Sequence, residues 1–188
     1  MPRTSRGKRS WWPGRRVGCL IKLWGIGHTS TNMFATLASN PTVLDVVMTL
    51  QGILSQVLDA KTRHTIAVAV SQANDCDYCL AMHTYVSSEL SGMSSDDIDL
   101  ARSGSSIDPK RAAVARFAEQ LVETCGQVSD GELAAVRGAG YADPQILAIV
   151  TVAVHVLLTN FINNVNQTEV DIPPSVRLVR RHERRGPR

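Results

Sequence analysis

Hydrophobic residues recur three and four positions apart along most of this 188-residue chain. No stretch alternates between hydrophobic and polar positions long enough to suggest a β-strand. Residues that favour helix starts and stops separate the apolar segments, as at Asn40-Pro41, Gly92 and Asp143-Pro144. The pattern predicts helices over residues 41–54, 61–73, 76–90, 94–101, 110–125, 129–138 and 143–164. About seven helices joined by short turns indicate an all-α fold, an orthogonal helical bundle.

Charge divides the chain into three parts. Residues 1–23 hold seven basic residues and no acid, and residues 175–188 hold six arginines against Glu183. The part between them keeps seven basic and sixteen acidic residues, a net charge of −9. We therefore expect a helical domain over residues 24–174, a basic and disordered extension over 1–23, and an Arg-rich tail over 175–188.

The basic ends raise the question of nucleic acids and membranes. The C-terminal arginines have no aromatic residues between them and lie outside the periodic region, so we expect solvated ends and no nucleic-acid partner. Arg15-Arg16 is a weak export signal, because Lys22 interrupts the apolar run that follows it. The longest apolar run, 146–159, is shorter than the ~20 residues that span a bilayer. These features favour a cytoplasmic protein, with this run in the core or at a subunit interface.

The four cysteines do not suggest a disulfide scaffold. Cys19 and Cys125 are isolated, whereas Cys76 and Cys79 form a CxxC pair. His83 follows seven residues after the first cysteine, so a helix would place all three side chains on one face. The imidazole could then accept or return a thiol proton. The residues alone do not decide which cysteine is the nucleophile, and they leave a zinc site possible.

The segment around this pair resembles the signature of the alkylhydroperoxidase D-like / carboxymuconolactone decarboxylase family, and the chain resembles the peroxidase-related branch of that family. The residues that carry the resemblance are 58–83, LDAKTRHTIAVAVSQANDCDYCLAMH, and the similarity extends over roughly Gly25 to Pro173. It implies an all-α fold that assembles as a trimer or hexamer. It also implies reduction of a small hydroperoxide, in which Cys79 is attacked and Cys76 resolves it as a disulfide. A lipoyl-type or thioredoxin-type dithiol protein would restore the thiols, and no cofactor or metal is expected.

One position departs from the family pattern. The family commonly has a glutamate twelve residues before the first cysteine, where this chain has His64. If the chain turns near Asn74, residue 64 should face His83 across a helical hairpin. A second imidazole cannot supply the negative charge that would hold His83 as imidazolium. Either the proton relay is less efficient, another acid such as Glu89 substitutes, or His64 completes a Cys2His2 metal site.

Two other functions remain open at this point. The first is decarboxylation of a lactone acid, which does not need paired cysteines. The second is a non-enzymatic helical oligomer whose cysteines and histidines hold zinc or sense redox state. Of the remaining polar residues, we expect His155 to be a hydrogen-bonded core or interface residue. For Asn160, Asn163 and Asn164, capping or interhelical hydrogen bonding is the expected role.

Overall fold

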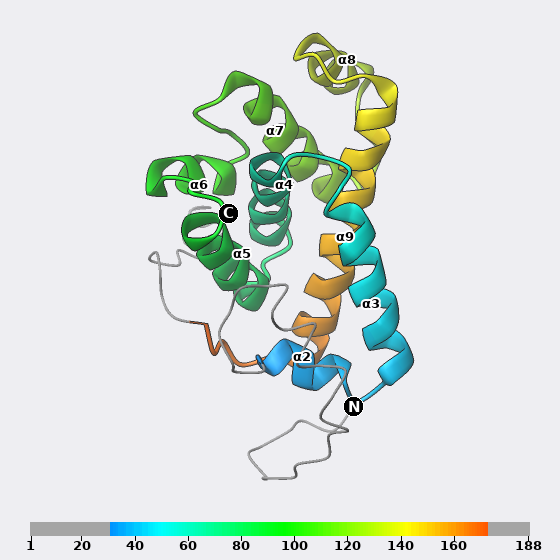
Figure 1. The fold of residues 1–188 in the computed structure, drawn as a ribbon. Coiled ribbons are helices and arrows are strands. Elements are labelled where there is room, and N and C mark those ends of the chain that lie inside the picture. Colours follow the sequence, from blue (N-terminus) through cyan, green and yellow to red (C-terminus); the bar gives the residue numbers. More distant parts are fainter. Residues whose placement is uncertain (1–30, 173–188) are drawn as a thin grey trace, which may run out of the picture.

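The computed structural model describes residues 31–172, and within that range it is helical with no strand (Figure 1). This confirms the all-α prediction. The predicted extension over 1–23 and tail over 175–188 lie outside the described residues. The helices are α2 (Asn32–Leu37), α3 (Pro41–Leu54), α4 (Ala60–Ala73), α5 (Asp77–Glu89), α6 (Ser95–Arg102), α7 (Pro109–Glu123), α8 (Asp130–Gly138) and α9 (Asp143–Asn166).

Helix α4 lies at the centre of the arrangement, with α5, α6, α7 and α9 packed around it (Figure 1). Every residue from Thr65 to Gln72 is buried. A helix with no polar stripe over two turns cannot keep one face in water, so the other helices must cover it on all sides. This is why the apolar run of 66–70 forms a central element and not a surface one.

Each predicted helix begins within one residue of its predicted start. The side chains of Asn40, Asp59, Ser94 and Ser129 each accept a hydrogen bond from a backbone N–H in the first turn. The larger differences are a helix that was not predicted and two helix ends, those of α7 and α9, that are two residues away from the prediction. The short α2 was not predicted, because six residues show no helical period. Helix α7 ends at Glu123, two residues early, and Cys125 adopts a left-handed backbone with a φ of 53° before Gly126.

Helix α9 is long and apolar enough, by length and composition, to cross a membrane. Its inner face, however, packs against α3, α4, α5 and α7 and carries the buried polar residues His155, Asn160 and Asn163. His155 donates a hydrogen bond from Nε2 to Oε1 of Gln51 at 2.7 Å, which fits the core role expected for it. We therefore interpret α9 as the core helix of a folded domain.

The thiol pair lies in an apolar cluster formed by α2, α3 and α5. Cys76 and Cys79 are buried there beside Met33, Phe34 and Met82. A second and larger cluster fills the space between α4, α7, α8 and α9. The thiols are therefore inside the protein, and a polar reactant must enter apolar surroundings to reach them.

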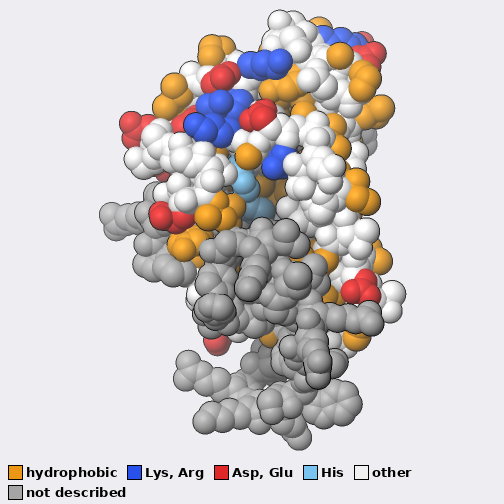
Figure 2. All heavy atoms as spheres, in the orientation of Figure 1, with side chains coloured by type: hydrophobic (Ala, Val, Ile, Leu, Met, Phe, Trp, Pro, Cys, Tyr) orange, Lys and Arg blue, Asp and Glu red, His pale blue; other side chains and the backbone are white. Residues whose placement is uncertain are grey.

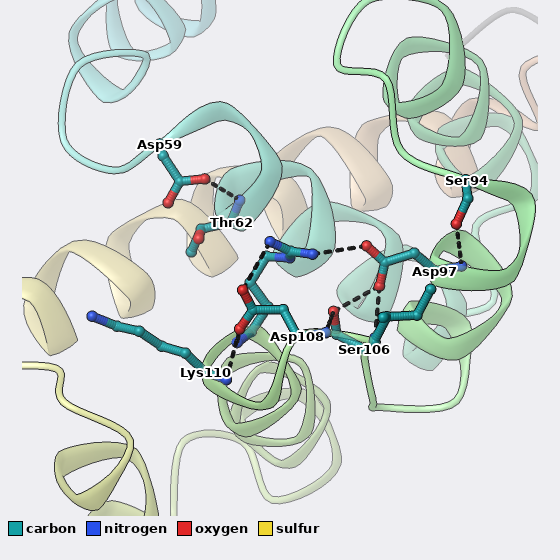
Figure 3. Close-up of polar contacts among 9 residues, drawn as sticks. Asp59, Thr62, Ser94, Asp97, Ser106, Asp108 and Lys110 are labelled. Carbon is teal, nitrogen blue, oxygen red and sulfur yellow. Dashed lines mark hydrogen bonds and ion pairs between the residues drawn. The ribbon is translucent and has the colours of Figure 1, made fainter.

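On the other side of α4, a buried carboxylate joins α6 to α7. Asp97 accepts hydrogen bonds from Ser106 Oγ at 2.7 Å and from the Ile107 N–H at 2.9 Å, and pairs with Arg111 Nη2 at 2.9 Å. Figure 3 shows Asp97 and Asp108 facing each other across the guanidinium group between them. Burial alone would raise the pKa of Asp97, but these hydrogen bonds and the Arg111 charge lower it below 3.8.

This geometry predicts that Asp97→Asn lowers the free energy of unfolding by about 2 kcal/mol at neutral pH, because it removes the charge that a partly buried arginine faces. The pKa of Asp97 is lower in the folded state, so the stabilisation is present above 3.8 and is lost as the pH falls through the lowered value. Urea unfolding at pH 7 and at acid pH measures both effects. The control is Asp96→Asn, an exposed neighbour in the same helical turn, which should change the stability by less than ~0.5 kcal/mol. Equal losses in the two variants would contradict the assignment.

Candidate active site

The turn between α4 and α5 positions the CxxC pair. Asn74 ends α4, and Asp75 takes a left-handed backbone with a φ of 49°. Cys76 is then the N-cap of α5, with extended φ and ψ of −97° and 93°. Its N–H donates to the Ser71 carbonyl at 3.0 Å, and its carbonyl accepts from the Leu80 N–H at 2.9 Å. Our expectation that both cysteines lie within one helix is therefore wrong for Cys76, because the left-handed residue delays the helix start by one position.

The two thiols remain adjacent and unequal. Cys76 and Cys79 are 1% and 2% exposed, and both are free thiols. The hydrogen bond between them raises the pKa of Cys76, which burial raises further. The same hydrogen bond lowers the pKa of Cys79 and outweighs the opposing effect of burial. Cys79 also lies in the first turn of α5, where the helix dipole favours negative charge. Of the two sulfurs, Cys79 therefore has the surroundings that favour ionisation, and Cys76 has surroundings that oppose it.

Helix α9 supplies the other groups around Cys79. Asn163 Nδ2 donates to the Cys79 sulfur at 3.2 Å. Hydrogen bonding from Asn163, and then from Asn160 and Thr159, lowers the pKa of Cys79 further. The expectation of interhelical hydrogen bonding for these asparagines is correct, but sequence reasoning did not connect them to the thiol. The only signal was the i, i+3 spacing of two asparagines in an otherwise apolar helix.

His83 follows Cys79 by one helical turn, and both line the same small cavity. Its buried Nδ1 has no hydrogen-bond partner among the described residues. Burial lowers the pKa of His83 to about 3, and the charges of His64 and His155 lower it too. The ring is therefore neutral at physiological pH. That differs from a histidine held as imidazolium by a carboxylate.

His64 lies on α4, close enough to His83 for its charge to act on that ring. Burial, followed by the charge of Arg63, lowers the pKa of His64 to about 4. The structure thus brings position 64 to His83, as the hairpin argument expected, without a carboxylate. Glu89 does not take its place: it is exposed near the end of α5 and accepts a hydrogen bond from Ser88.

The cavity next to Cys79 has a volume of about 30 Å³. This is enough for one or two molecules of the size of water. Apolar side chains make most of the wall, and the polar ones are Gln51, Tyr78, Thr159 and the imidazoles of His83 and His155. Figure 2 shows histidine side chains at the floor of a hollow on one face of the molecule.

The zinc alternative finds no support in this geometry. Within residues 31–172, no group of three or more histidine, cysteine, aspartate or glutamate side chains converges closely enough to hold a metal ion. A Cys2His2 set of Cys76, Cys79, His64 and His83 would need such convergence.

Solved structures share this fold. A peroxidase-related protein with an alkylhydroperoxidase core from Ralstonia eutropha JMP134 superposes with a TM-score of 0.71 at 21% identity, over 81% of this chain and 83% of the other. A peroxidase-related protein from Silicibacter sp. TM1040 gives 0.68 at 23% identity, over 79% and 80%. The debrominase Bmp8, solved with 2,3,4-tribromopyrrole, gives 0.71 at 13% identity, over 82% and 83%. These likenesses establish the fold.

Among curated proteins, none is similar enough in sequence to count as a relative. The model of the carboxymuconolactone decarboxylase family matches residues 41–123, which run from α3 through the CxxC turn to the end of α7. The match therefore includes both cysteines and both histidines of the candidate site, set in the fold shared with the alkylhydroperoxidase-like structures. The chain thus carries the carboxymuconolactone decarboxylase family match over residues 41–123, within a fold similar to that of alkylhydroperoxidase-like structures.

Proposed function

We propose that this protein is a thiol-dependent peroxidase, or a closely related disulfide oxidoreductase, that reduces small hydroperoxides through Cys79 and Cys76. Its family is consistent with either a peroxidase-related or a decarboxylase-like role. The observation that favours thiol chemistry is the asymmetry of the pair. The pKa of Cys79 is lowered and that of Cys76 is raised at two buried, adjacent sulfurs, and Cys79 faces a small cavity.

The reaction has two oxidative steps. The Cys79 thiolate attacks the terminal oxygen of the hydroperoxide, the O–O bond breaks, and the sulfur becomes a sulfenic acid as an alkoxide leaves. The proton released when Cys79 ionised ends on this alkoxide, which becomes an alcohol, or water when the substrate is hydrogen peroxide. The Cys76 thiol then attacks the sulfenic sulfur, water leaves, and a Cys76–Cys79 disulfide forms. An external dithiol of the lipoyl or thioredoxin type reduces it and is itself oxidised.

His83 is the group placed to carry the proton between sulfur and alkoxide. A neutral imidazole can accept the thiol proton and return it, but a pKa of about 3 makes it a weak base. We therefore expect slow turnover compared with a site in which a carboxylate supports the histidine. A cytoplasmic location, where thiols are kept reduced, is part of the proposal.

The decarboxylase-like alternative fits the cavity less well. A lactone acid carries a carboxylate, and a buried carboxylate needs a cation or several hydrogen-bond donors. Within residues 31–172, neither lysine nor arginine lines the cavity beside Cys79. The cavity suits a small neutral molecule such as a hydroperoxide.

The first test of the proposal is intact mass. Treatment of the reduced protein with a stoichiometric amount of hydrogen peroxide should remove two hydrogen atoms, and a dithiol should restore them. Peptide mapping should find the bond between Cys76 and Cys79, while the exposed Cys125 remains a thiol. Cys76→Ser should stop the reaction at a sulfenic acid on Cys79, and Cys79→Ser should abolish peroxide consumption. A disulfide to Cys125, or a wild-type protein that peroxide leaves reduced, would refute the proposal.

The second test addresses position 64. His64→Glu should raise the pKa of His83 from about 3, because an opposite charge within ~4–6 Å typically shifts a pKa by 1–3 units. The raised pKa would lie at roughly 4–6, so the ring becomes imidazolium in mildly acidic solution. There it should favour the Cys79 thiolate, so that peroxide oxidation below about pH 6 is faster than in the wild type. Proton NMR titration of the His83 ring and the pH dependence of Cys79 alkylation measure the two links separately.

His64→Gln is the matched control for this experiment. It has the size of glutamate without the charge, and it removes the histidine whose charge now lowers the pKa of His83. It should therefore raise that pKa less than His64→Glu does. If the two variants give the same His83 titration and the same Cys79 alkylation profile, the charge at position 64 does not influence the thiol centre.

A homo-oligomer, either a trimer or a hexamer, is part of the proposal. The outward face of α9 exposes Leu147, Val154, Phe161 and Val165, with Leu147 69% and Val165 70% exposed. Their spacing of seven, seven and four residues aligns them on one helical face, and such apolar patches mark interfaces. Light scattering at micromolar concentration should return at least three times the 20.4 kDa chain mass. Val154→Glu with Phe161→Glu should reduce it, and a wild-type monomer would contradict this part.

A further inference from the structure

Among residues 31–172, no positively charged side chain lines the cavity at Cys79. The titratable groups that face it are Cys76 before α5, Tyr78 and His83 on α5, and His155 on α9. Burial lowers the pKa of both histidines, so neither ring is cationic at neutral pH. Among the described residues that line the cavity there is no lysine, arginine, aspartate or glutamate. A thiolate here must be stabilised by neutral hydrogen-bond donors.

Two asparagines on α9 are placed to do this. Asn160 and Asn163 are 0% and 2% exposed, and their i, i+3 spacing puts them on one face of the helix. Asn163 Nδ2 donates to Cys79 Sγ, and Asn160 Nδ2 donates to Ser71 Oγ at 3.3 Å. The amide oxygen of each residue is buried and has no hydrogen-bond partner among the described residues. Buried amide oxygens without a partner are costly, and their presence beside a reactive sulfur indicates a ligand that donates a hydrogen.

We propose that Asn160 and Asn163 form an amide cradle at the Cys79 sulfur: the Asn163 N–H stabilises the thiolate, and the two amide oxygens accept the hydroxyl hydrogen of the sulfenic acid formed on it. The second half rests on the proposed peroxidase function. The first half requires only that Cys79 ionises. An amide suits both states, because its nitrogen donates to a negatively charged sulfur and its oxygen accepts from an S–O–H group without any net charge.

The thiolate half is tested by alkylation. Asn163→Leu keeps the side-chain size and removes the amide, so the pH midpoint of Cys79 alkylation, followed on its peptide by mass spectrometry, should rise by about one to two units. The control is Asn164→Leu, the exposed next residue, whose amide donates to the Asn74 carbonyl and not to sulfur. Its midpoint should match the wild type. An unchanged midpoint in a folded Asn163→Leu protein would overturn this half.

Asn163→Ser is a second variant for the alkylation test, in case Asn163→Leu does not fold. Serine fits the space and keeps one donor, so its midpoint should lie between those of the wild type and the leucine variant. If the Asn163→Leu protein does not fold, the Asn163→Ser variant decides. A midpoint of Cys79 alkylation equal to that of the wild type would then overturn the thiolate half. A raised midpoint would support it.

The sulfenic-acid half is tested in the Cys76→Ser background, where the Cys76–Cys79 disulfide cannot form. After one equivalent of hydrogen peroxide, a 1,3-dicarbonyl trap added at increasing delays measures how long the sulfenic acid persists. Asn160→Leu should shorten this time several-fold without moving the alkylation midpoint as far as Asn163→Leu does. An unchanged lifetime would overturn this half. If peroxide does not oxidise the wild-type thiol pair, both the peroxidase proposal and the sulfenic-acid half are wrong. The alkylation curves would still decide the thiolate half.

Discussion

The burial of α4 is the constraint from which the site follows. The polar side chains of a helix that is covered on all sides have little access to water, so their hydrogen-bond partners must come from inside the protein. Ser71 therefore accepts from Asn160 on α9 while its carbonyl accepts from the Cys76 N–H, and Gln72 accepts from Arg102 on α6. These hydrogen bonds connect the central helix to the elements that hold the thiols. The position of the CxxC turn is thus a consequence of satisfying buried polar groups, as much as of the apolar packing.

Burial also decides how the site handles charge. The low dielectric around α5 and α9 disfavours protonated histidine, and the charges of His64 and His155 act in the same direction, so the pKa of His83 falls to about 3. The same burial would raise the pKa of Cys79, but its sulfur has donors on two sides, the Cys76 thiol and the Asn163 amide. These neutral hydrogen-bond donors, held in place by the helices, can lower the pKa of Cys79 because burying them does not require the removal of an ion from water.

The sequence predicted the fold well because helix signals are local. Period, N-caps and the Asn74 turn gave most helix bounds to within one or two residues. It also placed Cys76, Cys79 and His83 together, and His64 opposite His83. It missed that Cys76 is an N-cap, since a left-handed Asp75 has no reliable signature outside glycine. It could not connect Asn163 to Cys79, because a contact 84 residues apart depends on the angle at which α9 crosses α5.

The replacement of a carboxylate by His64 and the presence of two asparagines at the sulfur are physically related. A carboxylate at position 64 would allow a cationic His83, and an imidazolium beside Cys79 could stabilise the thiolate by charge. His64 supplies no negative charge, so His83 stays neutral. Neutral hydrogen-bond donors must then stabilise the Cys79 thiolate. Such donors lower a thiol pKa less than a full charge does, but they leave the sulfur more basic and hence more nucleophilic once ionised. In such a site a smaller fraction of Cys79 is ionised, but each thiolate reacts faster. This suits a buried centre that one small molecule reaches at a time.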